Sequence, residues 1–198
     1  MPRKYVLGKR ATQLVDTRRR IVDAALELYL EKGIGATTML DIARRADVAP
    51  GTVANHFGSA EALATEVTTQ ILADLRMPTP DLFDGVEEMP DRIRLLIGEI
   101  SAFFERSTPW WKVQEREPAS VHAWSDAEAR YYVELDTLVR AALGPLADDA
   151  DAVAMIMVIL HAWVIGSLQR TGRTAEQAEG LVSDMLIAWL TTRHGSVT

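Results

Sequence analysis

The sequence predicts an all-α protein with a small N-terminal head and a larger C-terminal helical body. Apolar residues recur with the helical period in nearly every strong segment, and no stretch alternates convincingly like a strand. Glycine, proline or a capping Ser, Thr or Asp marks most segment ends. With 198 residues, 48% of them apolar, the chain is long enough to bury a substantial core.

The first two helices of the head are set by periodicity and caps. Residues 17–32 place apolar side chains at i, i+3, i+4, i+7 and i+8, and Gly33 follows as the expected C-cap residue. Thr38 and Asp41 have the spacing of a capping box, which predicts a short second helix that runs to Arg45.

A tight turn joins this helix to a third one. Asp47 occupies a turn position that needs a left-handed backbone, which Asp tolerates better than most residues. Pro50 suits the first turn of the third helix, which ends near residues 57–58. Ser59 is the expected cap of a fourth helix, residues 60–75.

The body begins after a connection rich in proline and acidic residues, 77–90. Pro109 and Pro118 are expected to bracket a short separate segment. The helices predicted for the body are residues 91–106, 120–143, 149–170 and 174–193.

Charge divides the chain unevenly. Residues 1–60 carry a net charge of +4 and residues 61–198 carry −11, for −7 overall. This pattern suits a head that meets a polyanion, and an unevenly charged solvated surface is the alternative.

Several classes of protein are excluded by composition. The absence of cysteine excludes a disulfide framework, a thiol nucleophile and cysteine-ligated metal. The longest nearly apolar run, residues 152–165, is too short to span a bilayer, and no secretory signal follows the N-terminal basic residues. We therefore expect a cytoplasmic protein without a membrane partner. No catalytic constellation, metal-ligand set or cofactor-binding loop is evident, so we expect neither enzyme activity nor a cofactor.

Residues 37–63 have the pattern of a helix-turn-helix, in which the second helix can enter a DNA major groove. Val53 and Phe57, four residues apart, anchor that helix to the core. The positions left facing away from the core or along its edge are Gly51, Thr52, Ala54, Asn55 and His56.

An ordered series of short matches runs through residues 17–63 and resembles the DNA-binding domain of the TetR family of transcriptional regulators. The matching elements are Thr17-Arg18, Ile21-Val22-Asp23-Ala24-Ala25, Leu28-Tyr29, Lys32-Gly33, Thr37-Thr38, Ile42-Ala43, Ala46, Val48, Pro50-Gly51-Thr52-Val53, His56-Phe57, Ser59 and Glu61-Ala62-Leu63. The resemblance implies a double-stranded DNA operator, a homodimer, and a small-molecule inducer held in the helical body.

Three positions depart from the family pattern. Family members usually have Ser, Tyr and Lys where this chain has Ala49, Ala54 and Ala60. The Tyr and Lys typically touch phosphates, so their absence implies either weaker DNA binding or compensation by the basic residues between Arg3 and Arg10. A decayed DNA-binding head on a small-molecule-binding or partner-docking protein is therefore the alternative function.

The candidate DNA contacts combine position with this resemblance. The hydroxyl of Thr38 suits either a phosphate or a helix cap, and the amide of Asn55 suits adenine. The full set of candidates is Arg18, Thr38, Arg44, Gly51, Thr52, Asn55 and His56.

The body offers two further candidate sites. Aromatic residues gather within a short stretch, which indicates either an apolar ligand pocket or ordinary core packing. The candidate ligand-binding residues are Phe103, Phe104, Trp110, Trp111, His122, Trp124, Glu128, Tyr131 and His161.

The last two predicted helices are apolar over much of their surface, which predicts a twofold dimer with a four-helix interface. Its candidate residues are Ile156, Leu160, Trp163, Val164, Met185, Leu186 and Trp189.

The sequence thus predicts a repressor that a small, largely apolar molecule releases from a palindromic operator. Its expected parts are a basic arm (1–16), a helix-turn-helix domain (17–63), a connecting helix (64–76), and a ligand-binding and dimerisation domain (77–198). Coupling between ligand and DNA is expected to pass through the fourth helix.

Overall fold

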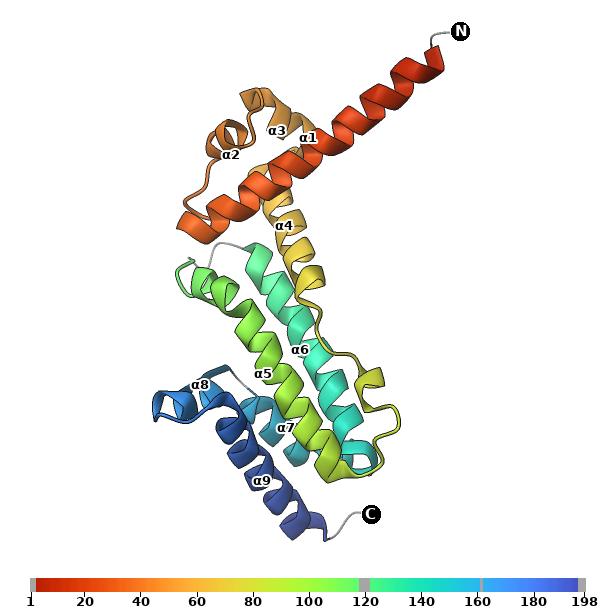
Figure 1. Ribbon diagram of the computed structural model, residues 1–198, viewed down its shortest axis with the longest axis vertical. Coiled ribbons are helices and arrows are strands. Elements are labelled where there is room, and N and C mark those ends of the chain that lie inside the picture. The colour runs from red at the N-terminus through yellow and green to blue at the C-terminus, as the bar shows by residue number, and fades with distance from the viewer. Residues whose placement is uncertain (1–2, 118–121, 161, 196–198) are drawn as a thin grey trace. The chain divides into compact units, whose positions relative to one another are not determined.

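The computed structural model describes residues 3–117, 122–160 and 162–195, and gives the backbone alone for 3–10, 122–127, 162 and 163. These parts of the chain are helical and contain no strand, which confirms the all-α prediction (Figure 1). The helices are α1 (Arg3–Lys32), α2 (Met39–Arg45), α3 (Pro50–Phe57), α4 (Ala60–Leu75), α5 (Met89–Gln114), α6 (His122–Leu143), α7 (Ala150–Ile159), α8 (Ala162–Arg170) and α9 (Ala175–His194). Short 3-10 turns, Pro80–Phe83 and Gly144–Leu146, precede α5 and α7.

The chain forms two compact units. Unit 1 comprises Met1–Asp74 and Pro109–Ala127, and unit 2 comprises Leu75–Thr108 and Glu128–Thr198. Helices α5 and α6 therefore each contribute residues to both units, and α4 ends at the boundary between them.

The core of unit 1 brings α1 to α4 together. Ile21 of α1, Ile42 of α2, Val53 of α3 and Leu63 of α4 are all almost completely buried. In unit 2, the buried core draws on α5, α6, α7 and α9, with further apolar residues of α8 packed against it. Unit 1 holds the residues predicted for the head, together with residues 109–127, which the sequence analysis places in the body.

Helix α1 begins at Arg3, whereas the sequence pattern predicts its start at Thr17. Residues 3–16 lack the apolar periodicity of the later turns, and this is why periodicity alone stops at residue 17. Their composition is nevertheless helix-favouring, because Arg, Lys, Leu, Ala and Gln all have good propensities. The basic arm is thus the helical N-terminal half of α1.

Pro109 lies inside α5, whereas the sequence pattern predicts that it ends a helix. Proline removes one backbone N–H from the ladder. In the preceding turn, the hydroxyls of Ser107 and Thr108 donate to the carbonyls of Phe103 and Phe104, each at 2.8 Å, and add polar contacts beside the gap. The segment with Trp110 and Trp111 therefore continues α5.

The predicted helix 149–170 is two helices, α7 and α8. The backbone of Leu160 leaves helical geometry with ψ at 0° and caps α7. The segments 150–159 and 164–170 are bent by 43°, and both α7 and α8 contact α9. Within the described residues no single helix is long and apolar enough to cross a membrane, although this bent pair together reaches that length and apolarity.

Candidate nucleic-acid interface

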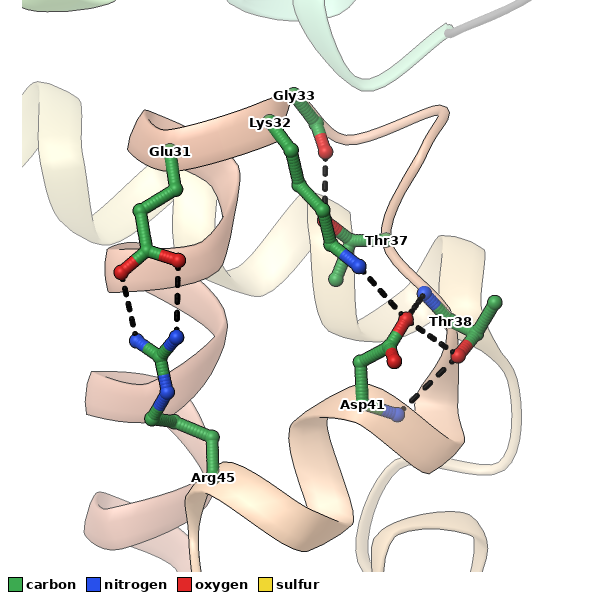
Figure 2. A network of polar contacts seen from close by, with 7 residues as sticks. All are labelled: Glu31, Lys32, Gly33, Thr37, Thr38, Asp41 and Arg45. Atoms are coloured by element: carbon green, nitrogen blue, oxygen red, sulfur yellow. Dashed lines mark hydrogen bonds and ion pairs between the residues drawn. The ribbon is translucent and has the colours of Figure 1, made fainter.

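The N-terminus of α2 is held by a capping box linked to α1. The backbone N–H of Asp41 donates to the hydroxyl of Thr38 at 3.1 Å, and the carboxylate of Asp41 accepts the Thr38 N–H at 3.0 Å and its hydroxyl at 2.7 Å. Lys32 donates to the same carboxylate at 2.8 Å (Figure 2). Lys32 first, and Thr38 next, hold the pKa of Asp41 well below its usual range. The predicted cap is confirmed, and a phosphate contact by Thr38 stays a prediction.

The loop between α1 and α2 has a partner that no local sequence pattern suggests. Gly33 adopts the left-handed backbone expected of a C-cap, with φ at 91°, and its carbonyl accepts the Thr37 hydroxyl at 2.6 Å (Figure 2). The carboxylate of Glu117 accepts the N–H of Ile34 and, at 3.0 Å, that of Gly35. Nearby Val113 is buried against Ile34 and other apolar residues of unit 1. The segment that follows α5 thereby stabilises the loop that leads to α2.

The turn between α2 and α3 has the predicted left-handed residue, because Asp47 has φ at 51°. Val48 N–H donates to the carbonyl of Ala43 at 3.0 Å and closes the turn. Arg20 reaches across from α1, donating to the carbonyl of Asp47 at 2.7 Å and to that of Ala46. Arg20 therefore holds the angle between the two helices, a role that its sequence position alone does not reveal.

Helix α3 is fixed by two apolar anchors and one arginine. Val53 and Phe57 are buried, as predicted. The guanidinium of Arg18 lies 4.3 Å from the centre of the Phe57 ring, donates to the carbonyl of His56 at 3.1 Å and pairs with Glu66. These contacts give Arg18 a structural role in joining α1, α3 and α4, and its predicted contact with DNA stays a prediction.

Away from these anchors, α3 presents an uncharged surface. Gly51 and Asn55 are exposed, and Thr52 and His56 are half-buried. No side chain caps the first turn, because the N-cap residue is Ala49. Short polar side chains and an open first turn are suited to direct contact with a ligand that carries both bases and phosphates.

The two arginines at the end of α2 differ in their surroundings. Arg45 is held by a two-bond contact with Glu31, at 2.8 and 2.9 Å (Figure 2). Arg45 also donates to Glu27 at 3.0 Å. Arg44 is exposed and has no hydrogen bond or ion pair with any residue whose side chain is described. Arg44 is therefore the better placed of the two for a phosphate.

Three of the candidate ligand-binding residues pack against one another. In unit 2, Phe103 stacks on Tyr131 with ring centres 5.9 Å apart, and Phe104 meets both rings edge-on. Phe103 and Tyr131 are only 2% and 7% exposed, and burial raises the pKa of Tyr131. These rings fill one another's space.

The remaining candidates are assigned to both units or have side chains that the structure does not describe. Trp110 packs against Val113 in unit 1, Trp111 is also in unit 1, and Glu128 is half-buried in unit 2. The side chains of His122, Trp124 and His161 lie outside the described residues. Among the side chains that are described, no three His, Asp or Glu residues gather as a metal site.

Three of the seven candidate dimer residues are buried inside the protomer. Ile156, Leu160 and Leu186 are buried in the core of unit 2, and Val164 and Trp189 pack against that core. Met185 is exposed, and the side chain of Trp163 is outside the described residues. The other large apolar side chains exposed on α7 and α9 are Met155, Val158 and Leu181.

Comparisons with known proteins give matches to the head and to most of the chain. The sequence profile of the family described as "Bacterial regulatory proteins, tetR family" matches residues 21–67. The HTH-type transcriptional regulator SrpR of Pseudomonas putida is 39% identical over 84 residues, which cover 40% of this chain and only 37% of SrpR. The HTH-type transcriptional regulator BetI of Burkholderia thailandensis is 24% identical over 184 residues, which cover 89% of this chain and 94% of BetI.

Among solved structures, the chain is similar in fold to NalD, the secondary repressor of the MexAB-OprM multidrug efflux pump in Pseudomonas aeruginosa. The TM-score is 0.57 at 19% identity, and the alignment covers 87% of this chain and 95% of NalD. The family consists of transcription regulators, which are not enzymes. The head of this chain, residues 21–67, is therefore similar in sequence to the TetR family of bacterial regulatory proteins, and the fold of the chain is similar to that of NalD.

Proposed function

We propose that this protein is a cytoplasmic repressor that binds a palindromic DNA operator as a homodimer and leaves it when a small, largely apolar molecule binds the body. The observation that carries the proposal is the exposed face of α3. Its buried anchors, Val53 and Phe57, leave Gly51 and Asn55 exposed on a helix whose entry and exit are both held by α1. The amide of Asn55 can pair with the N6 and N7 atoms of adenine.

Exposed apolar residues support a homodimer. Met155 and Val158 on α7, and Leu181 and Met185 on α9, are all exposed on helices that contact each other. A second copy that covers them would form the four-helix interface expected of a twofold dimer. Such a dimer would place two α3 helices in successive major grooves, roughly 34–36 Å apart. Met185→Glu puts a charge on this surface and should yield monomers in sedimentation, whereas an unchanged dimer would exclude the surface as the interface.

An apolar ligand at the aromatic cluster of unit 2 would have to displace side chains that pack against one another. Phe103, Phe104 and Tyr131 fill their own space, so a ligand at this place must separate the rings. That requirement fits an effector that selects a second conformation of the body. To invert a 99:1 population the effector must prefer this second conformation by about 10⁴-fold.

The connectivity of the chain supports coupling between ligand and DNA through α5 and α6 as well as through α4. Helices α5 and α6 each carry residues of both units, and Glu117 lies three residues after the end of α5. A shift of α5 would therefore act on the loop before α2, while α4 would act on Arg18 through Glu66.

Selection of bound sequences from random duplex DNA at about 100 mM salt tests the proposal. We expect a palindromic motif. Absence of any enriched motif, with binding that disappears on added salt, would overturn the proposal. It would favour a decayed head, for which the exposure of Ala49, Ala54 and Ala60 is the supporting observation, because none of them supplies a cap or a charge.

A further inference from the structure

Most positive charges of the head are already used inside the protein. Among the Lys and Arg side chains of unit 1 from residue 11 to residue 74, four are engaged by carboxylates, carbonyls or both. Arg18 pairs with Glu66, Lys32 with Asp41, and Arg45 with Glu27 and Glu31, while Arg20 donates to two turn carbonyls. A phosphate that approached these groups would share them with the internal partners that already neutralise part of their charge.

Two cations of this region remain available. Arg44 has no partner among the described side chains. Arg19 has only Asp16, at 3.8 Å, and both side chains are more than half exposed. Such an exposed pair contributes little and separates readily. Two cations are few for a duplex DNA, whose backbone charge dominates the affinity of most DNA-binding proteins.

The N-terminal half of α1 carries the missing charge. This segment, Arg3–Asp16, is here named the α1 arm. It holds Arg3, Lys4, Lys9 and Arg10, and its one acidic residue is Asp16. All of its described side chains are exposed, including Leu14 at 60% and Val15 at 67%. The described part of the arm is thus open to solvent.

The arm continues α1 as one helix, ahead of the turns that contact α2 (Figure 1). A rise of 1.5 Å per residue makes its fourteen residues roughly 21 Å long. One base pair occupies about 3.4 Å along duplex DNA, so the arm matches about six base pairs.

We propose that the α1 arm binds the phosphate backbone of duplex DNA beside the bases that α3 reads. This inference rests on the proposed function, because duplex DNA is the partner in both. Charge favours this partner over the arm of a second copy, since two segments with four cations each would repel one another. The arm would restore the counterion release that Ala54 and Ala60 do not provide.

The test replaces the four cations of the arm by glutamine, which keeps helix propensity: Arg3→Gln, Lys4→Gln, Lys9→Gln and Arg10→Gln. The matched control replaces four exposed cations of unit 2 in the same way, which are Arg94, Arg106, Arg130 and Arg173. Both variants have the same net charge. Dissociation constants are measured between about 50 and 200 mM salt. One probe is the duplex recovered by selection and the other is a duplex of arbitrary sequence.

Removing one phosphate contact lowers the slope of log K against log salt by about 0.9. Removing two such contacts changes the salt dependence of affinity. A rise from 50 to 200 mM salt then weakens DNA binding by the arm variant about 12-fold less than DNA binding by the wild type. We expect at least this change on both duplexes, and an unchanged slope for the control variant. Circular dichroism confirms that both variants stay helical.

Equal slopes for the arm variant and the wild type on both duplexes would overturn the inference, even where the wild type selects a clear operator. Equal slope changes in the arm and control variants would also overturn it, because net charge would then be the cause. Arm-dependent binding to vesicles with anionic lipid, without such binding to DNA, would assign the arm to a membrane surface instead. If the arm variant has a changed slope on the arbitrary duplex and the wild type selects no motif, DNA binding by the arm is supported and the proposed operator is refuted.

Discussion

Glu117 provides the sharpest test of how unit 1 is stabilised. Its carboxylate accepts two backbone N–H groups from the loop between α1 and α2, those of Ile34 and Gly35. Hydrogen bonds to charged groups contribute about 1.5–3 kcal/mol each when protected from water. Gly35 is exposed and can bond water instead, so Glu117→Ala should cost about 1–2 kcal/mol, chiefly through Ile34. Glu117→Gln keeps one acceptor and should cost about half as much.

The free energy of unfolding is measured by urea denaturation, and hydrogen exchange reports on the amide of Ile34. A decrease of about 1.4 kcal/mol raises the exchange rate of that amide about tenfold when local opening controls it. Glu115→Ala is the matched control, because Glu115 lies on the same segment and its side chain is exposed. If Glu117→Ala has the same urea midpoint and the same Ile34 exchange rate as the wild type, the assigned role of this carboxylate is refuted.

Three further changes test the helix-turn-helix. Thr38→Ala should lower the free energy of unfolding by about 1 kcal/mol through removal of the N-cap, and Thr38→Ser should restore most of it; equal urea midpoints would exclude the cap. Asp47→Gly should raise stability by about 0.5–1 kcal/mol, because φ at 51° is strained for Asp and the carbonyl bonded by Arg20 remains. Burial, and secondarily Glu117, raises the pKa of Tyr29 from 10.0 to about 12. The folded state therefore favours the neutral phenol, and this contribution is complete below pH 10 and is lost as pH rises towards 12. Tyr29→Phe should remove this part of the alkaline decrease in denaturation midpoints.

The short elements of the head could be predicted from sequence because each carries its own local signal. The capping box at Thr38, the left-handed Asp47 and the proline at the start of α3 depend on neighbouring residues alone. The anchors Val53 and Phe57 follow from helical spacing and are buried as expected. Local chemistry therefore determines where these helices begin and end.

Features that depend on tertiary contacts do not follow from local patterns. Glu117 contacts a loop more than eighty positions earlier in the chain, and Arg20 reaches a turn twenty-six positions away. No glycine or proline in the sequence signals that α7 ends at Ile159. The extension of α1 shows the converse, because good helix propensity without apolar periodicity still forms a helix.

The candidate sites show the same limit. Aromatic residues close together in sequence are divided between two units, since α5 contributes to both. Apolar residues chosen for the dimer are mostly the inner face of their helices, because a helix that is apolar nearly all round does not reveal which face its own chain covers. Only the fold separates Ile156, which is buried, from Met155 and Val158, which are exposed.

The claim that the exposed face of α3 reads DNA bases is tested most directly by comparing sequence selection for the wild type and for Asn55→Ala. The account predicts a palindromic motif for the wild type. It predicts that Asn55→Ala retains this motif but loses about 1–3 kcal/mol of discrimination at one symmetric pair of positions. A variant that selects the wild-type motif with undiminished preference at every position would contradict base reading by Asn55 and by the face on which it lies.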